Sequence, residues 1–468
     1  MELKRQLGLF TGIFVIVADM IGTGIFMTTG TILGMTQSAP VVLALWGIGG
    51  IVAICGALSY AELAVLWPES GGEYVYLRNI YGPLPAFLTG WISLVVGFSA
   101  PVAVSSLLCI QYLNRFLHGT SGDASVMLLD DPWVQKSLAA GLIVLFGAIH
   151  VIGVKGGSRL QNLLTGIKIL LVLALIVLGL SRADWGMAHH RLAAQYGPAP
   201  GAGWMLPQAG LSLLIIMYAY SGWNCAAYLG GEMREPQKNL PRALLFGTLV
   251  TLVLYLLLNI VFLISADGPE LMSKEEVGAV AVSRLFDHGV SSAFTLGIAV
   301  ILLSAVSAQM MVGPRVTYAM AKDGMIFRSL ASVHPRFETP HAAILVQMLL
   351  AVLYVFTGSA LSLVVYMGFA LSIFPLMAVI GLVWLRRARP EIRSSYRVPL
   401  YPVIPLLYIA ITIVMMLTAL MTWTKTSCIA IAVVLLGIVV FRAWEGISPH
   451  SGALPLGEKG SEGQNDRA

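Results

Sequence analysis

The sequence predicts an all-α integral membrane protein, on three observations. Hydrophobic residues make up 57% of the 468 residues and charged residues only 11%, which leaves too little charge for an ordinary soluble surface. Apolar stretches of about 20 residues, the length that a helix needs to cross a bilayer, recur along the chain. Lys and Arg gather in alternate connections between these stretches. We place twelve transmembrane helices near residues 10–34, 39–66, 85–117, 133–153, 160–181, 208–231, 240–265, 290–320, 341–357, 361–385, 402–424 and 426–444.

The first ten stretches form two related halves. The first half covers residues 10–181 and the second covers residues 208–385, with five predicted spans in each. Because five is odd, the second half must cross the membrane in the opposite direction, so we expect inverted repeats. The remaining segments are a cytoplasmic N-terminus (1–9), a basic cytoplasmic loop (386–401), two C-terminal spans (402–444) and a disordered cytoplasmic tail (445–468).

The distribution of positive charge predicts the orientation. With a cytoplasmic N-terminus, 20 of the 28 Lys and Arg residues fall in inside segments and 7 fall outside, while Lys168 lies within a span. This bias predicts a multi-pass protein of the cytoplasmic membrane with both termini in the cytoplasm. The net charge of +5 then reflects contact with anionic lipid of the bilayer and requires no nucleic-acid partner.

Each half opens with a predicted helix that is interrupted. In the first, Asp19 precedes Gly22-Thr23-Gly24 in the middle of the apolar stretch, and in the second Ser221-Gly222-Trp223-Asn224 stands at the matching place. Glycine weakens a helix interior by roughly 1 kcal/mol, and a carboxylate at bilayer depth costs roughly 2.5–3.5 kcal/mol on insertion scales. Glycine for close helix packing is the alternative explanation. Paired broken helices in inverted repeats favour a secondary transporter with its substrate at the midplane.

The two breaks predict complementary binding groups. Unwinding at Gly22-Thr23-Gly24 frees backbone N–H groups at the start of the outer half-helix, where the helix dipole also suits a carboxylate. The second break is expected to free carbonyl groups at Tyr218, Ala219 and Ser221, which suit an ammonium group. Together they describe a receptor for a zwitterionic α-amino acid.

Two ionisable residues lie at bilayer depth. Lys168 stands eight residues beyond Leu160, which at ~1.5 Å per residue is ~12 Å into the membrane. It is either a snorkelling lysine or an ammonium that replaces a coupling Na⁺ and bridges the fifth span to the broken first span. Asp19 has four interpretations: it pairs with Lys168, binds a substrate amine, accepts a proton, or is a satisfied structural carboxylate. Glu62, near the inner end of the second span, is expected to be structural.

Other function classes find no support in the sequence. The eight histidines make no constellation with Ser or Asp that would suit catalysis, so we expect no enzyme. No Cys and His spacing suggests a metal, and nothing indicates a cofactor. Cys55, Cys109, Cys225 and Cys428 all fall within predicted spans, so no disulfide framework is expected.

These motifs resemble the amino acid–polyamine–organocation superfamily, and within it the L-type amino acid transporters and their bacterial relatives. The resemblance covers most of the first eight spans. It rests on five motifs in order: Ile21-Gly22-Thr23-Gly24-Ile25-Phe26, the stretch from Gly56 to Tyr74, Tyr218-Ala219-Tyr220-Ser221-Gly222-Trp223-Asn224, Gly231-Glu232-Met233 with Asn239-Leu240-Pro241, and Ala321-Lys322-Asp323-Gly324.

The resemblance implies a fold and a set of binding residues. The fold would be the LeuT-like arrangement of two inverted five-helix repeats plus two helices, with the first and sixth helices broken. The substrate carboxylate would bind the N–H groups of Thr23, Gly24 and Ile25. The amino group would bind carbonyls of the residues Met20, Tyr218, Ala219 and Ser221, with Asn224 in the same break and Tyr218 as an aromatic gate. Lys168 would occupy the second sodium site, which relatives complete with hydroxyls at the places of Ser304 and Ser307.

The resemblance also implies a function, and this chain departs from the family pattern in three places. We expect Na⁺-independent exchange or H⁺ symport of neutral L-amino acids. Asp19 stands where a small neutral or amide residue is common, so the alternative is a transporter of polyamines, cationic amino acids or amines with Asp19 as the amine ligand. Ser221 stands where glycine is frequent, which would shrink the pocket. The exterior loop from His118 to Lys136 has no cysteine, so no disulfide-linked heavy chain is expected.

Overall fold

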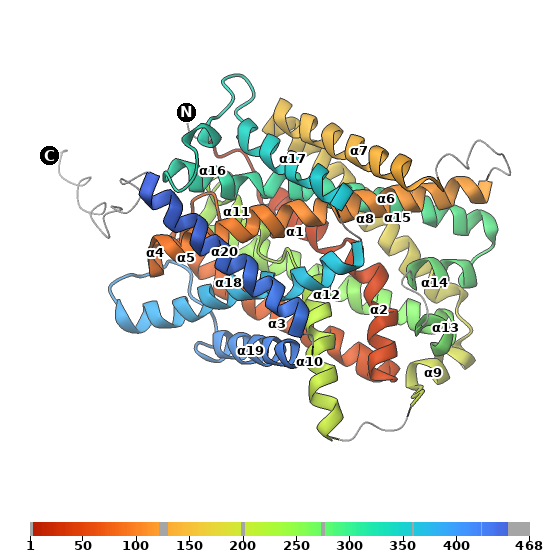
Figure 1. The fold of residues 1–468 in the computed structure, drawn as a ribbon. Coiled ribbons are helices and arrows are strands. Elements are labelled where there is room, and N and C mark those ends of the chain that lie inside the picture. Colours follow the sequence, from red (N-terminus) through yellow and green to blue (C-terminus); the bar gives the residue numbers. More distant parts are fainter. Residues whose placement is uncertain are drawn as a thin grey trace.

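The computed structural model describes residues 3–120, 130–197, 202–272, 277–357, 360–422 and 424–447, and these form a bundle of helices (Figure 1). The helices before the second break are α1 (Leu9–Met20), α2 (Thr23–Thr36), α3 (Ala39–Leu66), α4 (Glu73–Tyr81), α5 (Pro83–Ile92), α6 (Ser99–Thr120), α7 (Pro132–Ile152), α8 (Val154–Arg182), α9 (Trp185–Ala193) and α10 (Ala202–Ala219). Those after it are α11 (Cys225–Tyr228), α12 (Pro236–Ser265), α13 (Gly268–Met272), α14 (Val277–Leu285), α15 (His288–Val312), α16 (Pro314–Lys322), α17 (His341–Thr357), α18 (Ala360–Ala388), α19 (Val403–Thr422) and α20 (Thr424–Ile447).

Among the described residues, nine helices are long and apolar enough to cross a membrane, and the pair α1 and α2 makes a tenth if it counts as one bent span. Two shorter apolar helices, at 207–219 and 341–356, lie where the sixth and ninth spans are predicted. The third predicted span contains a π-helical turn at Ser93–Phe98, which joins α5 to α6. Helix α20 continues to Ile447, past the predicted start of the tail at residue 445, and the rest of the predicted tail lies outside the described residues.

The first helix is broken where the sequence predicts. Helix α1 ends at Met20 and α2 begins at Thr23, with a bend of 42° between them. The second break runs from Tyr220 to Asn224, between α10 and α11. Gly222 lies in this segment with φ +97°, a backbone conformation that only glycine adopts without strain. An alanine Cβ at this residue would also lie 2.3 Å from Oδ2 of Asp19.

The two broken helices cross in opposite directions. Helix α2 packs against α10, while α1 packs against α11. In Figure 1, α2 lies toward the end of the bundle that carries α9, α13 and α14, and α11 lies toward the opposite end, with α4 and α16. The first helix therefore runs from one end to the other while the second runs back. This crossing brings the two breaks together in the interior.

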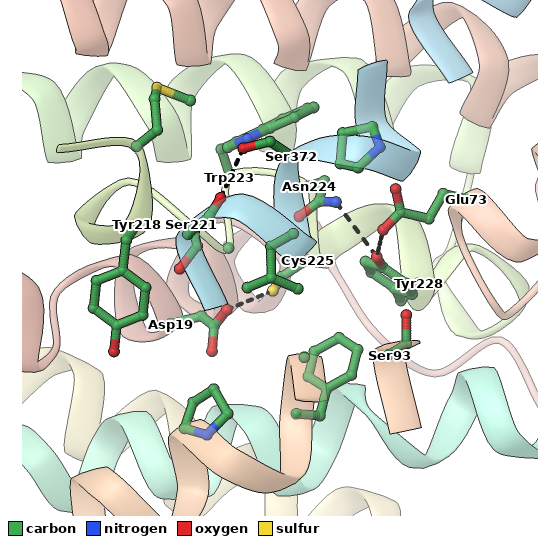
Figure 2. A pocket seen from close by; sticks show the side chains of 18 of the residues that line it. Asp19, Glu73, Ser93, Tyr218, Ser221, Trp223, Asn224, Cys225, Tyr228 and Ser372 are labelled. Atoms are coloured by element: carbon green, nitrogen blue, oxygen red, sulfur yellow. Dashed lines mark hydrogen bonds between the residues drawn. The ribbon is translucent and has the colours of Figure 1, made fainter. Parts of the chain in front are cut away.

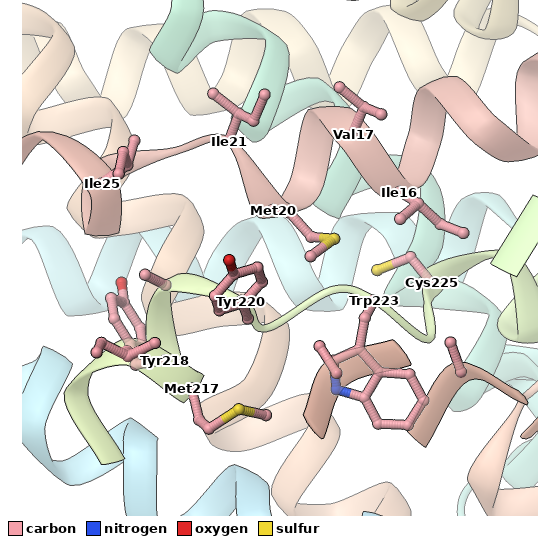
Figure 3. Close-up of a cluster of buried hydrophobic side chains, with 14 of the residues drawn as sticks. Ile16, Val17, Met20, Ile21, Ile25, Met217, Tyr218, Tyr220, Trp223 and Cys225 are labelled. Atoms are coloured by element: carbon pink, nitrogen blue, oxygen red, sulfur yellow. The ribbon is translucent and has the colours of Figure 1, made fainter. Parts of the chain in front are cut away.

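Apolar side chains surround the crossing (Figure 3). Met20, Ile21 and Trp223 are almost fully buried there. Beside them, the rings of Trp46, Tyr220 and Tyr255 form a compact cluster with centroids 5.0–5.8 Å apart. These rings join α3 and α12 to the second break. Because aromatic pairs of this geometry add stability beyond burial alone, the cluster holds the unwound segment in place.

One buried and one partly buried ion pair hold the end of the bundle near α4 and α16. Glu232 accepts from Nε and Nη2 of Arg315 at 2.7 and 3.0 Å. Glu62 pairs with Arg386, whose Nε lies 2.8 Å from its Oε1, and it also accepts from the amide of Val398 at 2.8 Å. Charges buried in this way need paired, hydrogen-bonded partners. The structural role expected for Glu62 agrees with these contacts.

Candidate substrate site at the helix breaks

The first turn of α2 presents backbone N–H groups. Thr23, Gly24 and Ile25 open the helix, so their N–H groups have no intrahelical acceptor. The residue before them, Gly22, has no side chain that could cap the helix. Gly24 also lies against the second broken helix, because a Cβ there would lie 2.6 Å from Cα of Ala219. A larger residue at Gly24 would therefore separate α2 from α10 as well as block the N–H groups.

The carbonyl groups predicted to bind an ammonium already have protein donors, with one exception. The carbonyl of Tyr218 accepts from the amide of Ser221 at 3.0 Å. The hydroxyl of Tyr255 lies 2.8 Å from the carbonyl of Ala219 and also bonds that of Met20, so its one proton is shared between the two breaks. The carbonyl of Met20 accepts from the amide of Gly22 as well, at 2.9 Å. Within the described chain, no such partner is found for the carbonyl of Ser221. Through the hydroxyl of Tyr255, the carbonyls of Met20 and Ala219 thus join the two broken helices to each other.

Asp19 points into the interior beside the second break (Figure 2). Its Oδ2 accepts a hydrogen bond from Sγ of Cys225 at 2.9 Å. Its Oδ1 is buried and makes no hydrogen bond of normal geometry among the described residues, while the side chain of Gln309 and the ammonium of Lys168 both interact with the carboxylate. Asp19 and Lys168 both lie in the described part of the chain, and no ion pair within 4 Å joins them. A direct ion pair with Lys168 is thus not formed, although the two charges lie close enough to interact.

Lys168 lies on α8 and reaches the end of the first half-helix. Its Nζ donates to the carbonyl of Ala18 at 2.7 Å and to that of Ile21 at 2.5 Å. The side chain is fully buried, which differs from a snorkelling lysine at a helix end. The ammonium group thus takes up carbonyls that the break in α1 leaves without intrahelical donors.

Ser304 and Ser307 lie on the same helix, α15, but have other partners. Oγ of Ser304 lies 3.4 Å from Oγ1 of Thr165, and Oγ of Ser307 lies 3.0 Å from Nε2 of the buried His150. Within the described chain, neither hydroxyl bonds Lys168. The two serines therefore belong to polar contacts of α15 with α8 and α7.

A cavity extends from the crossing of the breaks toward α4 (Figure 2). Its lining includes Asp19, Tyr218 and Ser221 together with Asn224 and Glu73. A smaller space adjoins it at the amides of α2, with Asp19, Thr23 and Gly24 in its lining. The hydroxyl of Tyr218 bonds Oγ1 of Thr23 at 3.2 Å and so joins the two broken helices at this point.

Sequence reasoning missed several residues of this site. Tyr255 stands in the middle of an apolar span, where a tyrosine gives no local sign of its partners. Cys225 and Glu73 contribute to the cavity through contacts between distant segments. Gln309 lines both spaces with its Oε1 buried and without a partner among the described residues. The only sequence feature that could have indicated Gln309 was its polarity within the apolar span 290–320. The part of the chain that the structure describes holds no cluster of three or more His, Cys, Asp and Glu suited to a metal.

These features define a class of protein: a multi-pass membrane protein whose two broken helices enclose a central polar cavity. The family model for amino acid permeases matches residues 7–441. The chain belongs to this family, within the amino acid–polyamine–organocation superfamily, and amino acid transport is its general function.

Curated relatives match nearly the whole chain. The b(0,+)-type amino acid transporter 1 of Mus musculus is 30% identical over 92% of this chain and 86% of its own length. The serine/threonine exchanger SteT of Bacillus subtilis (strain 168) is 29% identical over 94% of this chain and 96% of its own. The cystine/glutamate transporter of Homo sapiens is 27% identical over 95% and 86%.

Proposed function

We propose that this protein is a secondary active transporter of L-amino acids in the cytoplasmic membrane. It has twelve spans arranged as two inverted LeuT-like repeats plus two helices, has both termini in the cytoplasm, and works by alternating access. The observation that carries the proposal is the crossing of the breaks. There the free N–H groups of α2 and the free oxygen of Asp19 face connected spaces.

The substrate is held at both of its charged groups. Its carboxylate binds the N–H groups of Thr23, Gly24 and Ile25, since donors and dipole at a helix N-terminus favour an anion. Its ammonium group binds the carbonyl of Ser221 and the free Oδ1 of Asp19. The remaining carbonyls, already bonded within the protein, fix the distance between the two half-sites.

Coupling does not use Na⁺. The ammonium of Lys168 already occupies carbonyls at the end of α1, where a sodium ion would need oxygen ligands. The transporter is therefore a Na⁺-independent exchanger or an H⁺ symporter, and it has no enzymatic activity. It works without a disulfide-linked heavy chain, because the exterior loop between His118 and Lys136 has no cysteine.

Two substrate classes are candidates for this cavity. The sequence predicts neutral amino acids, as the family resemblance implies. A second candidate, a cationic amino acid or a polyamine, is favoured by one observation: the described residues that line the cavity include two carboxylates and no Lys, Arg or His. A cavity of that charge attracts a positively charged substrate.

A thermal-shift screen of the twenty L-amino acids and of polyamines tests the proposal. A ligand that binds the folded state at 100 times its Kd stabilises it by about 2.7 kcal/mol. We expect at least one L-amino acid to raise the unfolding temperature, while its amide or decarboxylated analogue does so far less. Stabilisation by putrescine or agmatine with no response to any amino acid would refute the carboxylate site and leave an amine transporter.

A further inference from the structure

Glu73 is a second carboxylate in the cavity that holds Asp19. It is the first residue of α4 and only 6% exposed, and it lines the end of the cavity away from the amides of α2. Its Oε2 accepts from the hydroxyl of Tyr60 at 2.7 Å, and its Oε1 accepts from that of Tyr228 (Figure 2). No cationic side chain of the described chain lies within 4 Å of it.

An anion in such a place needs a positive charge from elsewhere. Burying a carboxylate is costly unless a proton or a cation compensates it. The buried ammonium of Lys168 is bonded to carbonyls of α1, and Lys168 is not among the residues that line the cavity. The described lining therefore offers acceptors at both ends and no cation, so the compensating charge comes either from a proton or from a bound substrate.

The walls around Glu73 suit a cation rather than an aliphatic side chain. The ring centroids of Tyr60 and Trp223 are 4.7 Å apart, and those of Tyr228 and Phe98 are 5.4 Å apart. Tyr228, Trp223 and Phe98 all line the cavity. Aromatic rings attract an ammonium or guanidinium group near their faces, and more strongly where water is excluded. Carboxylate and rings together form a receptor for a desolvated positive group.

The two carboxylates both accept from residues of one short helix, α11. Cys225, which donates to Asp19, and Tyr228, which donates to Glu73, are three residues apart on α11, a rise of ~4.5 Å. Lys and Arg carry their side-chain charge on stems of four and three methylenes. Such a stem is longer than the rise between Cys225 and Tyr228. Gln309, 8% exposed and with an unpartnered Oε1, lines the same cavity and offers an acceptor for an ammonium group.

We propose that Glu73, held by Tyr60 and Tyr228, binds the distal cation of the substrate side chain, so that the transporter's substrates are basic L-amino acids. This inference rests on the proposed function and names its substrate class. In it, the N–H groups of α2 bind the α-carboxylate, Asp19 binds the α-ammonium and Glu73 binds the side-chain charge. The neutral class is then the weaker of the two candidates.

The test compares charged ligands with neutral ligands of the same shape. Binding of lysine against norleucine, and of arginine against citrulline, is measured by scintillation proximity or thermal shift on the purified full-length protein. We expect the basic member to bind about tenfold or more tightly in each pair, as for a desolvated charge pair. Glu73→Gln keeps the shape of the side chain and should reduce both ratios to near one. The matched control is Glu69→Gln in the loop before α4, which removes a half-exposed partner of Arg78 outside this cavity and should leave both ratios unchanged.

Each outcome decides between the possibilities. Tighter binding of the basic ligands that is lost in Glu73→Gln supports the subsite. If the basic ligands show no advantage, or keep it in Glu73→Gln, the subsite is overturned, while binding of norleucine or citrulline would still support an amino acid transporter. If no amino acid binds at all, the proposed function itself fails. Tyr228→Phe, which removes one donor to Glu73 without changing charge, should lower the ratios less than Glu73→Gln does; an equal or larger effect would assign the cation preference to the tyrosine.

Discussion

The hydroxyl of Tyr255 fastens the two broken helices to each other, so its removal should weaken the substrate site more than its size suggests. The hydroxyl lies on α12 and reaches the carbonyls of Met20 and Ala219, one at each break. In Tyr255→Phe the ring still packs on Trp46 and Tyr220, at centroid distances of 5.2 and 5.0 Å. The loss is thus confined to the hydrogen bonds and to the carbonyl of Ala219 left unpaired, because that of Met20 keeps the amide of Gly22.

The magnitude follows from these contacts. A net hydrogen bond contributes about 0.5–1.5 kcal/mol, and a buried acceptor left unsatisfied costs about 1–3 kcal/mol. We therefore expect Tyr255→Phe to lower the free energy of unfolding by about 1–3 kcal/mol. Since every 1.4 kcal/mol is tenfold in affinity, we expect the Kd for substrate to rise about tenfold if about 1.4 kcal/mol of the loss falls on the bound state alone.

A neighbouring tyrosine supplies the control. Tyr220 belongs to the same aromatic cluster, and its hydroxyl donates to the carbonyl of Trp46 at 3.1 Å, which joins the second break to α3 but not to the first break. Tyr220→Phe should reduce stability by about 1 kcal/mol and leave the Kd within about twofold. Unfolding temperature and substrate Kd are measured for both variants. Equal changes in Kd for the two would refute the claim that Tyr255 sets the distance between the half-sites.

Two further predictions concern the ammonium and the glycine at the breaks. Lys168→Met removes both hydrogen bonds to α1 and leaves the carbonyls of Ala18 and Ile21 buried and unpaired, which costs about 1–3 kcal/mol for each carbonyl. Uptake into proteoliposomes should therefore fall at least about tenfold. Near-normal uptake would contradict the role given to this lysine. Gly222→Ala places a Cβ 2.3 Å from Oδ2 of Asp19 at φ +97°, while Gly82→Ala meets nothing within 4 Å at a similar φ of +95°. Both changes carry the backbone cost of about 1–2 kcal/mol, but substrate binding should be lost in Gly222→Ala alone, and equal binding in the two variants would argue against a site beside Gly222.

The helix breaks were predictable from the sequence because their cause is local. Glycines and polar residues inside an apolar run are unfavourable in a helix and in lipid. The observed ends of α1 and α10, at Met20 and Ala219, accordingly fall within a few residues of the predicted breaks. Lys168 stood out for the same reason, as a charge deep within an apolar stretch.

The partners of these residues depend on packing between distant segments, which one sequence does not reveal. Tyr255 bonds residues that precede it by 235 and 36 positions, and nothing in its own span indicates them. In the sequence, Glu73 follows a glycine-rich turn and resembles a loop residue. In the structure it begins α4 and is buried against Tyr60 and Tyr228. The direction in which Ser307 on α15 points could not be predicted either, because its partner His150 lies on α7.

Uptake of a radiolabelled amino acid into proteoliposomes, with external Na⁺ or with choline in its place, tests the central claim most directly. The substrate is the amino acid that gives the largest thermal shift, and empty liposomes serve as the control. We expect the same initial rate in both media, because Lys168 already holds the carbonyls of Ala18 and Ile21. Uptake that requires Na⁺ would contradict it.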